Sequence, residues 1–313
     1  MKLRVDQPDG HADGDAQAAR QGERTPHVQV AENRERRPQA GPVNAPHREE
    51  RGRTVNRVRT TARPGQEPRL AQPASPRTLG EEVVIVLSLS LLASAAYAIL
   101  DLLSAPVNRS VAVVTFSQSP QLARQLLDIA FALPPVWLVF YLVRRNGEGA
   151  STIGMALDRP LPDVAWGAVL AAIVGAAGIG VYLGAVQLGI NRIVVPVPPT
   201  GRWWTVPVFV LGAFQNALLE ETVVVGYLVT RLRQIGWGAA AAVAASAVLR
   251  GSYHLYQGWG GFAGNVAMGL FFCWIFLRWR RTWPLVVAHT LIDVGAAVLY
   301  ILFKSHLPGV TGS

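Results

Sequence analysis

Two adjacent glutamates, Glu220 and Glu221, lie in the middle of an apolar stretch over residues 206–229 that is long enough to cross a membrane. An ionised carboxylate at bilayer depth costs at least about 2.5–3.5 kcal/mol on insertion scales, and two neighbouring carboxylates also repel each other. Because spanning a bilayer requires neither glutamate, we interpret this pair as the centre of a functional site.

Polar residues also interrupt the apolar stretches around this pair. Several of them are four positions apart, which places both members on one face of a helix. In a bilayer such faces turn toward one another or toward a water-filled cavity. The spaced pairs are Asn216 with Glu220, Arg250 with His254, and His289 with Asp293; Gln215, Tyr253 and Asn265 are further polar residues in these stretches.

The chemistry that these residue types permit is narrow. A carboxylate such as Glu220 can act as a general base toward a bound water, and a histidine on a facing helix can share the proton transfer. A second histidine with an acidic neighbour can stabilise a developing oxyanion. This equipment suits hydrolysis of an amide by direct attack of water. No serine or cysteine is placed as an evident nucleophile.

Two other interpretations of the same residues stay open. Glu220, His254 and His289 can be read as ligands of a zinc ion with one position left for water, although no His-Glu-x-x-His motif is present. Each polar residue alone is also compatible with a structural hydrogen bond, and Arg250 is available to pair with a glutamate. The three spaced pairs together favour a site.

The charge of the chain is concentrated in two kinds of segment. The chain has 313 residues and a formal net charge of +9, with one cysteine, Cys273, in an apolar run. Residues 1–80 are rich in Arg, Pro, Gln, Ala, Asp and Gly, which predicts a disordered tail that attracts anionic lipid head groups. The other arginines cluster between apolar stretches. This distribution favours a membrane protein and no nucleic-acid partner.

The remainder of the chain predicts an all-α, polytopic transmembrane bundle of about seven spans. We divide it into N-terminal helices at 81–160, a core carrying the site at 161–303 and a short tail at 304–313. A double proline at 134–135 predicts a kink, and the small residues of 238–246 predict a helix at the centre of the bundle. The spans are expected near 83–105, 122–143, 164–190, 205–230, 237–256, 261–278 and 283–303.

Arginine placement predicts the orientation of the bundle. With a cytoplasmic N-terminus, every inside link carries a cluster of arginines, and the Arg-rich tail agrees with this arrangement. We therefore expect a multi-pass protein of the cell membrane with its N-terminus inside and its C-terminus outside. The clusters are Arg144, Arg145 and Arg159; Arg231 and Arg233; and Arg278, Arg280 and Arg281.

At these residues the chain resembles the CPBP family of intramembrane proteases, which includes the type II CAAX prenyl endopeptidases and the bacterial Abi proteins. The family motifs are Glu-Glu-x-x-x-Arg, Phe-x-x-x-His and His-x-x-x-Asn/Asp. Here they read Glu220-Glu221-Thr-Val-Val-Val225, Arg250-Gly-Ser-Tyr-His254 and His289-Thr-Leu-Ile-Asp293. The resemblance covers roughly residues 160–303.

The resemblance implies roles for the motif residues. Glu220 would activate the water, Glu221 would assist or orient it, and His254 would share the proton. His289 and Asp293 would form the oxyanion site. Apart from the resemblance, their places in the apolar stretches lead us to expect supporting roles for Asn216, Arg250 and Asn265. Many members of the family are called metalloproteases, while a metal-free glutamate mechanism has been argued for the prenyl-protein enzymes.

Two departures from the motifs stand out. Val225 replaces the motif arginine, and Arg250 replaces the motif phenylalanine. We hypothesise that Arg250 supplies the lost positive charge from the neighbouring helix. Without such compensation the resemblance would leave a weak or inactive relative.

The expected function is hydrolysis of a peptide bond in a membrane-associated protein or peptide. The alternatives are a non-catalytic membrane protein of the same fold, acting as a scaffold or immunity factor, and a proton-coupled carrier. The family name suggests a prenylated substrate. The excess of 27 Arg over 2 Lys is typical of a GC-rich bacterial genome, which favours other membrane peptides or precursor proteins.

Overall fold

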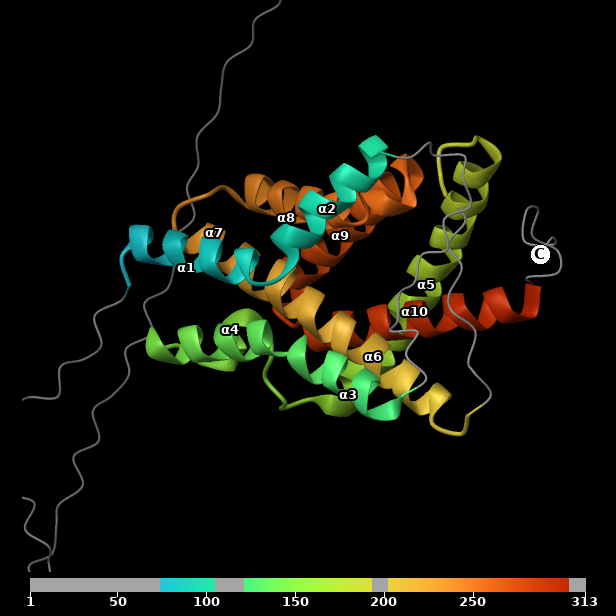
Figure 1. The fold of residues 1–313 in the computed structure, drawn as a ribbon. Coiled ribbons are helices and arrows are strands. Elements are labelled where there is room, and N and C mark those ends of the chain that lie inside the picture. Colours follow the sequence, from blue (N-terminus) through green and yellow to red (C-terminus); the bar gives the residue numbers. More distant parts are fainter. Residues whose placement is uncertain (1–73, 105–120, 193–201, 304–313) are drawn as a thin grey trace, which may run out of the picture. The chain divides into compact units, whose positions relative to one another are not determined.

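A computed structural model describes residues 74–104, 121–192 and 202–303 (Figure 1). The described residues form helices and contain no β-strand, which confirms the expected all-α class. Most of the predicted disordered tail and the predicted short tail at 304–313 lie outside the described residues.

Helices near the N-terminus begin earlier than the expected boundary at residue 81. Helix α1 begins at Pro76, where a proline with a preset φ suits the first helical position. The Ser75 hydroxyl caps it by accepting a hydrogen bond from the backbone N–H of Thr78 at 3.2 Å. The helices of this half are α1 (Pro76–Ser88), α2 (Leu91–Ser104), α3 (Leu122–Phe131), α4 (Pro134–Arg145), the short 3₁₀ turn η1 (Ala150–Ile153) and α5 (Pro160–Gln187).

The second half of the chain carries the polar pairs. One helical segment runs continuously over 205–234 and changes to π-helical geometry in its middle. The elements are α6 (Thr205–Glu220), the π-helix η2 (Glu221–Leu228), α7 (Val229–Gln234), α8 (Ala239–Tyr253), the 3₁₀ turn η3 (Leu255–Gln257), α9 (Trp259–Trp279) and α10 (Trp283–Phe303).

The count of candidate membrane spans differs from the expected seven. Five helical segments of the described chain are long and apolar enough to cross a bilayer, and a sixth is the pair α1 and α2, bent by 53°. The expected span near 237–256 is shorter than predicted, because α8 has 15 residues and rises only about 22 Å. The expected kink at Pro134 is present as a break between α3 and α4.

The small residues of 238–246 predicted that α8 lies at the centre of the helix packing, but η2 is the more buried element. All eight residues of η2 are buried, whereas α8 buries one face and exposes the other. Helix α8 packs against α9 and α2, and α10 packs against α5 and α6 (Figure 1). The small residues instead allow a close α8–α9 contact, where a Cβ on Gly269 would lie 2.9 Å from the Cα of Ala247.

Candidate active site

The carboxylate of Glu220 is held from two helices. Glu220 is the last residue of α6, and its Oε1 accepts a hydrogen bond from Asn216 Nδ2 at 3.1 Å, one turn earlier. Its Oε2 accepts a hydrogen bond from the Tyr253 hydroxyl of α8 at 2.8 Å. The expected Asn216–Glu220 pair is therefore formed, and the carboxylate is buried and fixed in orientation.

His254 lies beside the same carboxylate. It follows α8 directly, where the chain leaves the helix, and its Nε2 is 3.8 Å from Glu220 Oε2. Its Nδ1 is 3.4 Å from the side-chain amide of Gln257. The buried Nε2 makes no hydrogen bond within the described part of the chain. The histidine thus presents a free nitrogen toward Glu220.

Glu221 has different partners from its neighbour. Its Oε1 accepts a hydrogen bond from Arg250 Nη2 at 2.5 Å and lies 2.8 Å from His289 Nδ1. The same guanidinium nitrogen is 4.0 Å from Glu220, and the guanidinium stands over the ring of Phe272. Arg250 therefore occupies the position that we hypothesised for it, beside the carboxylate that the motif arginine would otherwise face.

The change of helix type occurs between the two glutamates. Glu220 ends α6 and Glu221 begins the π-helix η2. Neighbouring helical residues point in different directions, so Glu220 faces the end of α8 while Glu221 faces Arg250 and α10. Wider helical turns of this kind occur often at functional sites. Because Glu220 and Glu221 have different hydrogen-bond partners, both carboxylates can be buried in one region.

His289 and Asp293 form the third pair on α10. His289 Nε2 lies 3.6 Å from Asp293 Oδ1, so the imidazole stands between Asp293 and Glu221. The Asp293 side chain is 35% exposed, whereas those of the two glutamates are almost fully buried. The cluster is therefore most accessible on the side of Asp293.

Two of the contributing residues were undervalued by sequence reasoning. Tyr253 was noted only as a polar residue, because a hydroxyl next to a motif histidine gives no sign of its partner. Arg192, which directly follows an apolar stretch, was not among the candidate residues. In the structure Arg192 is buried, and its Nη1 donates to the carbonyl of Tyr256 at 3.0 Å while its backbone N–H donates to the carbonyl of Gln257 at 2.7 Å.

The neighbouring Asn191 completes this support. Its Oδ1 accepts a hydrogen bond from the backbone N–H of Gly261 at 2.7 Å, at the start of α9. Together Asn191 and Arg192 fix the turn that follows His254. Their signal in the sequence was two polar residues directly after an apolar stretch, which is also typical of an ordinary membrane-exit link.

Asn265 is not brought into the cluster. Its side chain donates to the carbonyl of Gly261 in its own helix at 2.9 Å, and the described residues give it no contact with a carboxylate. The expected supporting role of Asn265 therefore has no geometric basis in this arrangement.

The arrangement does not fit the zinc ligands considered from the sequence. No group of three or more His, Cys, Asp or Glu side chains in the described residues is arranged to hold a metal ion. Both nitrogens of His289 already face carboxylates, those of Glu221 and Asp293, and the guanidinium of Arg250 lies next to both glutamates. A divalent cation at Glu220 would have to sit beside that fixed positive charge.

Comparison with known proteins identifies one family. The model of the type II CAAX prenyl endopeptidase Rce1-like family matches residues 202–295, the segment that contains both glutamates, both histidines and Asp293. No curated protein and no solved structure matched the chain. The family implies a hydrolase in general, and its match together with the apolar helices indicates a multi-pass membrane protein. The match supports assignment of the chain to the CPBP family of CAAX-type intramembrane proteases.

Proposed function

We propose that the protein is an intramembrane endopeptidase in which Glu220 and His254 activate a water molecule for attack on a peptide carbonyl. The observation that carries this proposal is the pairing of Glu220 Oε2 with an unbonded His254 Nε2 at 3.8 Å. Hydrogen bonds to water are about 2.8–3.0 Å long, so one water molecule can contact both atoms at this separation.

The proton transfers follow from that geometry. Glu220 takes a proton from the water as its oxygen bonds to the peptide carbon, giving a tetrahedral oxyanion. The carbon–nitrogen bond then breaks, and the proton passes through Glu220 or His254 to the leaving nitrogen. The products are a carboxylic acid and an amine, which exchange a proton to give a carboxylate and an ammonium group. Asn216 and Tyr253 hold the Glu220 carboxylate in place during both steps.

Glu221, Arg250 and His289 have an orienting role in this proposal. The Arg250 guanidinium and the His289 imidazole both contact Glu221 Oε1, so Glu221 fixes the ring of His289. His289 Nε2 lies 3.6 Å from Asp293, whose side chain is the most exposed carboxylate of the cluster. We assign stabilisation of the oxyanion to His289. Asp293 acts by orienting that imidazole, because an ionised carboxylate would repel the oxyanion.

The proposed substrate is a peptide bond of a membrane-associated protein or peptide, and the proposed location is the cell membrane with a cytoplasmic N-terminus. Arg231 contacts Glu148, and Arg281 contacts Asp158, in the segment that follows Arg144 and Arg145. The three arginine clusters therefore share one end of the helices, which supports the orientation that the positive-inside rule predicts.

A proteolysis assay in liposomes tests the proposal. Purified protein is incubated with membrane proteins extracted from the expression host, and new peptide N-termini are identified by mass spectrometry with and without a chelator. We expect cleavage products that are absent from Glu220→Gln and from His254→Ala. Cleavage that survives the chelator would support the metal-free mechanism, whereas loss restored by zinc alone would overturn it.

Other outcomes would assign another function. Products that persist unchanged in both variants would contradict the proposed roles of Glu220 and His254. A protein that cleaves nothing but keeps a membrane partner in both variants would be a scaffold. A pH-dependent flux that Glu220→Gln converts to an uncoupled leak would identify a carrier.

A further inference from the structure

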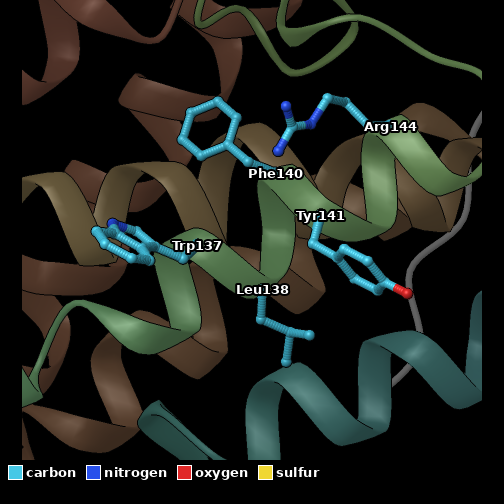
Figure 2. Close-up of a pocket in the computed structure, with 5 residues that line it drawn as sticks. All are labelled: Trp137, Leu138, Phe140, Tyr141 and Arg144. Atoms are coloured by element: carbon cyan, nitrogen blue, oxygen red, sulfur yellow. The ribbon is translucent and has the colours of Figure 1, made fainter.

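An open pocket of about 390 Å³ lies on α4, and no residue of the candidate active site lines it. It is lined by Trp137, Leu138, Phe140, Tyr141 and Arg144 (Figure 2). Trp137 is 74% exposed and Tyr141 is 56% exposed, although both lie in a segment apolar enough to span a membrane. A hollow with exposed aromatic rings on a membrane helix faces lipid rather than the protein interior.

The guanidinium of Arg144 stands at one end of this pocket. Figure 2 shows its side chain extending back along the helix toward Phe140. Within the described residues Arg144 has no carboxylate partner, whereas the adjacent Arg145 is paired with Glu82 at 3.3 Å. Arg144 and Arg145 therefore lie at the same helix end, but only Arg145 is paired with a carboxylate of the described chain.

We propose that this pocket binds an anionic phospholipid, with the lipid phosphate at Arg144 and an acyl chain along the aromatic residues. The spacing supports this occupant. Residues 137, 140, 141 and 144 follow the i, i+3, i+4, i+7 pattern of one helix face, and Trp137 lies about 10 Å along the axis from Arg144. That separation spans the region from the phosphate to the upper acyl chain, where aromatic side chains are enriched.

Charge complementarity decides between lipid classes. An arginine fork matches the geometry of a phosphate, and an arginine near an anionic membrane surface contributes about 1 kcal/mol. A zwitterionic lipid carries its own cation next to the phosphate, which offsets this attraction. The site is therefore selective for head groups such as phosphatidylglycerol over phosphatidylcholine.

Native mass spectrometry of the full chain tests the proposal. The protein is equilibrated in nanodiscs that contain equal amounts of phosphatidylglycerol and phosphatidylcholine, and the lipids retained on release are counted. We expect retained phosphatidylglycerol on the wild type and about a fivefold reduction in Arg144→Gln. Arg145→Gln is the matched control, and it should retain phosphatidylglycerol as the wild type does.

Trp137→Ala provides a second measurement. It removes aromatic surface and no charge, so it should weaken retention of the anionic lipid while leaving the preference for it over phosphatidylcholine. Equal losses in Arg144→Gln and Arg145→Gln would show diffuse surface charge only and would overturn the proposal. Formation of a dimer that requires Trp137 and Arg144, with unchanged lipid retention, would assign the face to a second copy of the chain and would also overturn it.

Discussion

Two polar regions share the continuous helical segment over 205–234, and they differ in how their charges are matched. The first is the candidate active site. The second, the helix-end network, joins the middle of α1, the end of α4 and the segment after it with η2 and α7. It comprises Glu82, Arg145, Asn146, Glu148, Tyr227, Arg231 and Gln234.

In the helix-end network each carboxylate has its own arginine. Glu82 pairs with Arg145, and Glu148 pairs with Arg231 at 2.5 Å. In the candidate site Glu220 and Glu221 share one arginine, Arg250, while Asp293 lies beside the His289 imidazole. The other polar partners of the glutamates are imidazoles, an amide and a hydroxyl. Arginine stays charged at any pH, whereas a histidine gains and loses a proton near neutrality. A matched network holds helices together, and an unmatched cluster can exchange protons.

The largest predicted effect concerns Glu220. Glu220→Gln keeps one carbonyl oxygen, which can accept from Asn216, and its amide N–H can donate to the Tyr253 oxygen. The base is removed, so we expect proteolysis to fall by about 10²–10⁴-fold with little change in thermal stability. Glu82→Gln, the equivalent change in the helix-end network, should lower stability and leave the rate per folded molecule intact. Initial rates and melting curves in detergent measure both. Similar activity in the two variants would show that the candidate site and the helix-end network do not differ in function.

Removal of an arginine separates the two regions in a second way. Arg250→Ala removes the arginine partner of the buried Glu221 carboxylate and leaves it with His289. Losing one member of a buried ion pair costs about 3–5 kcal/mol of stability and would disturb His289, so activity should also be lost. Arg231→Ala should destabilise the protein without a specific loss of rate.

Glu221→Gln tests the cause of the Arg250 effect. The double variant Arg250→Ala/Glu221→Gln should recover part of the stability, because it no longer buries an uncompensated charge. Thermal unfolding of the single and double variants measures this coupling. A fully folded and fully active Arg250→Ala would remove the hypothesis that Arg250 replaces the motif arginine.

A smaller effect is predicted for Tyr253→Phe. Loss of a hydrogen bond to a charged group costs about 1.5–3 kcal/mol, of which part reaches the transition state, so we expect the rate to fall by about tenfold. Tyr227→Phe removes a hydroxyl that donates to Glu82 at 3.5 Å and is the matched control, with no expected change in rate. A loss of kcat in the control equal to that in Tyr253→Phe would contradict a positioning role for Tyr253.

The smallest effect concerns Arg281, outside both regions. Its guanidinium donates to Asp158 at 2.8 Å and to Asp163, and the hydrogen bond from Arg281 holds the pKa of the Asp158 carboxyl below its ordinary value. A lowered folded-state pKa contributes stability above the ordinary carboxyl pKa, and this contribution is lost as the pH falls through the folded-state value.

The corresponding test is a pH series on Arg281→Gln. The variant should melt below the wild type at neutral pH, and the difference should shrink as the pH is lowered through the acid range. A difference that grows at low pH would contradict this assignment. Activity per folded molecule should stay unchanged, because Arg281 touches neither glutamate.

Much of the fold could be read from hydropathy because a bilayer requires long apolar helices. The spans near 205–230, 261–278 and 283–303 match α6 to α7, α9 and α10 closely. The span near 237–256 did not, since composition alone does not reveal where α8 ends. Helix α8 ends at Tyr253, and the turn η3 and Gly258, with a φ of 101°, then lead the chain into α9.

Within the site, the spacing of four between polar residues identified which residues share a face, and the pair Asn216–Glu220 follows from that rule. The partners across helices did not follow from it. Tyr253 and Arg192 entered the site, and Asn265 did not, because packing against other helices decides which polar groups meet.

The sequence by itself determined that acids and imidazoles lie within or directly after apolar helical stretches, because apolar length and helical period are local properties of the chain. Only the tertiary structure decided that Glu220 faces Tyr253 and His254 while Glu221 faces Arg250 and His289. The physical reason is that the close packing of α8 on α9 and the change to π-helical geometry at Glu221 set the directions of these side chains. Neither feature is encoded in the spacing of the motif residues.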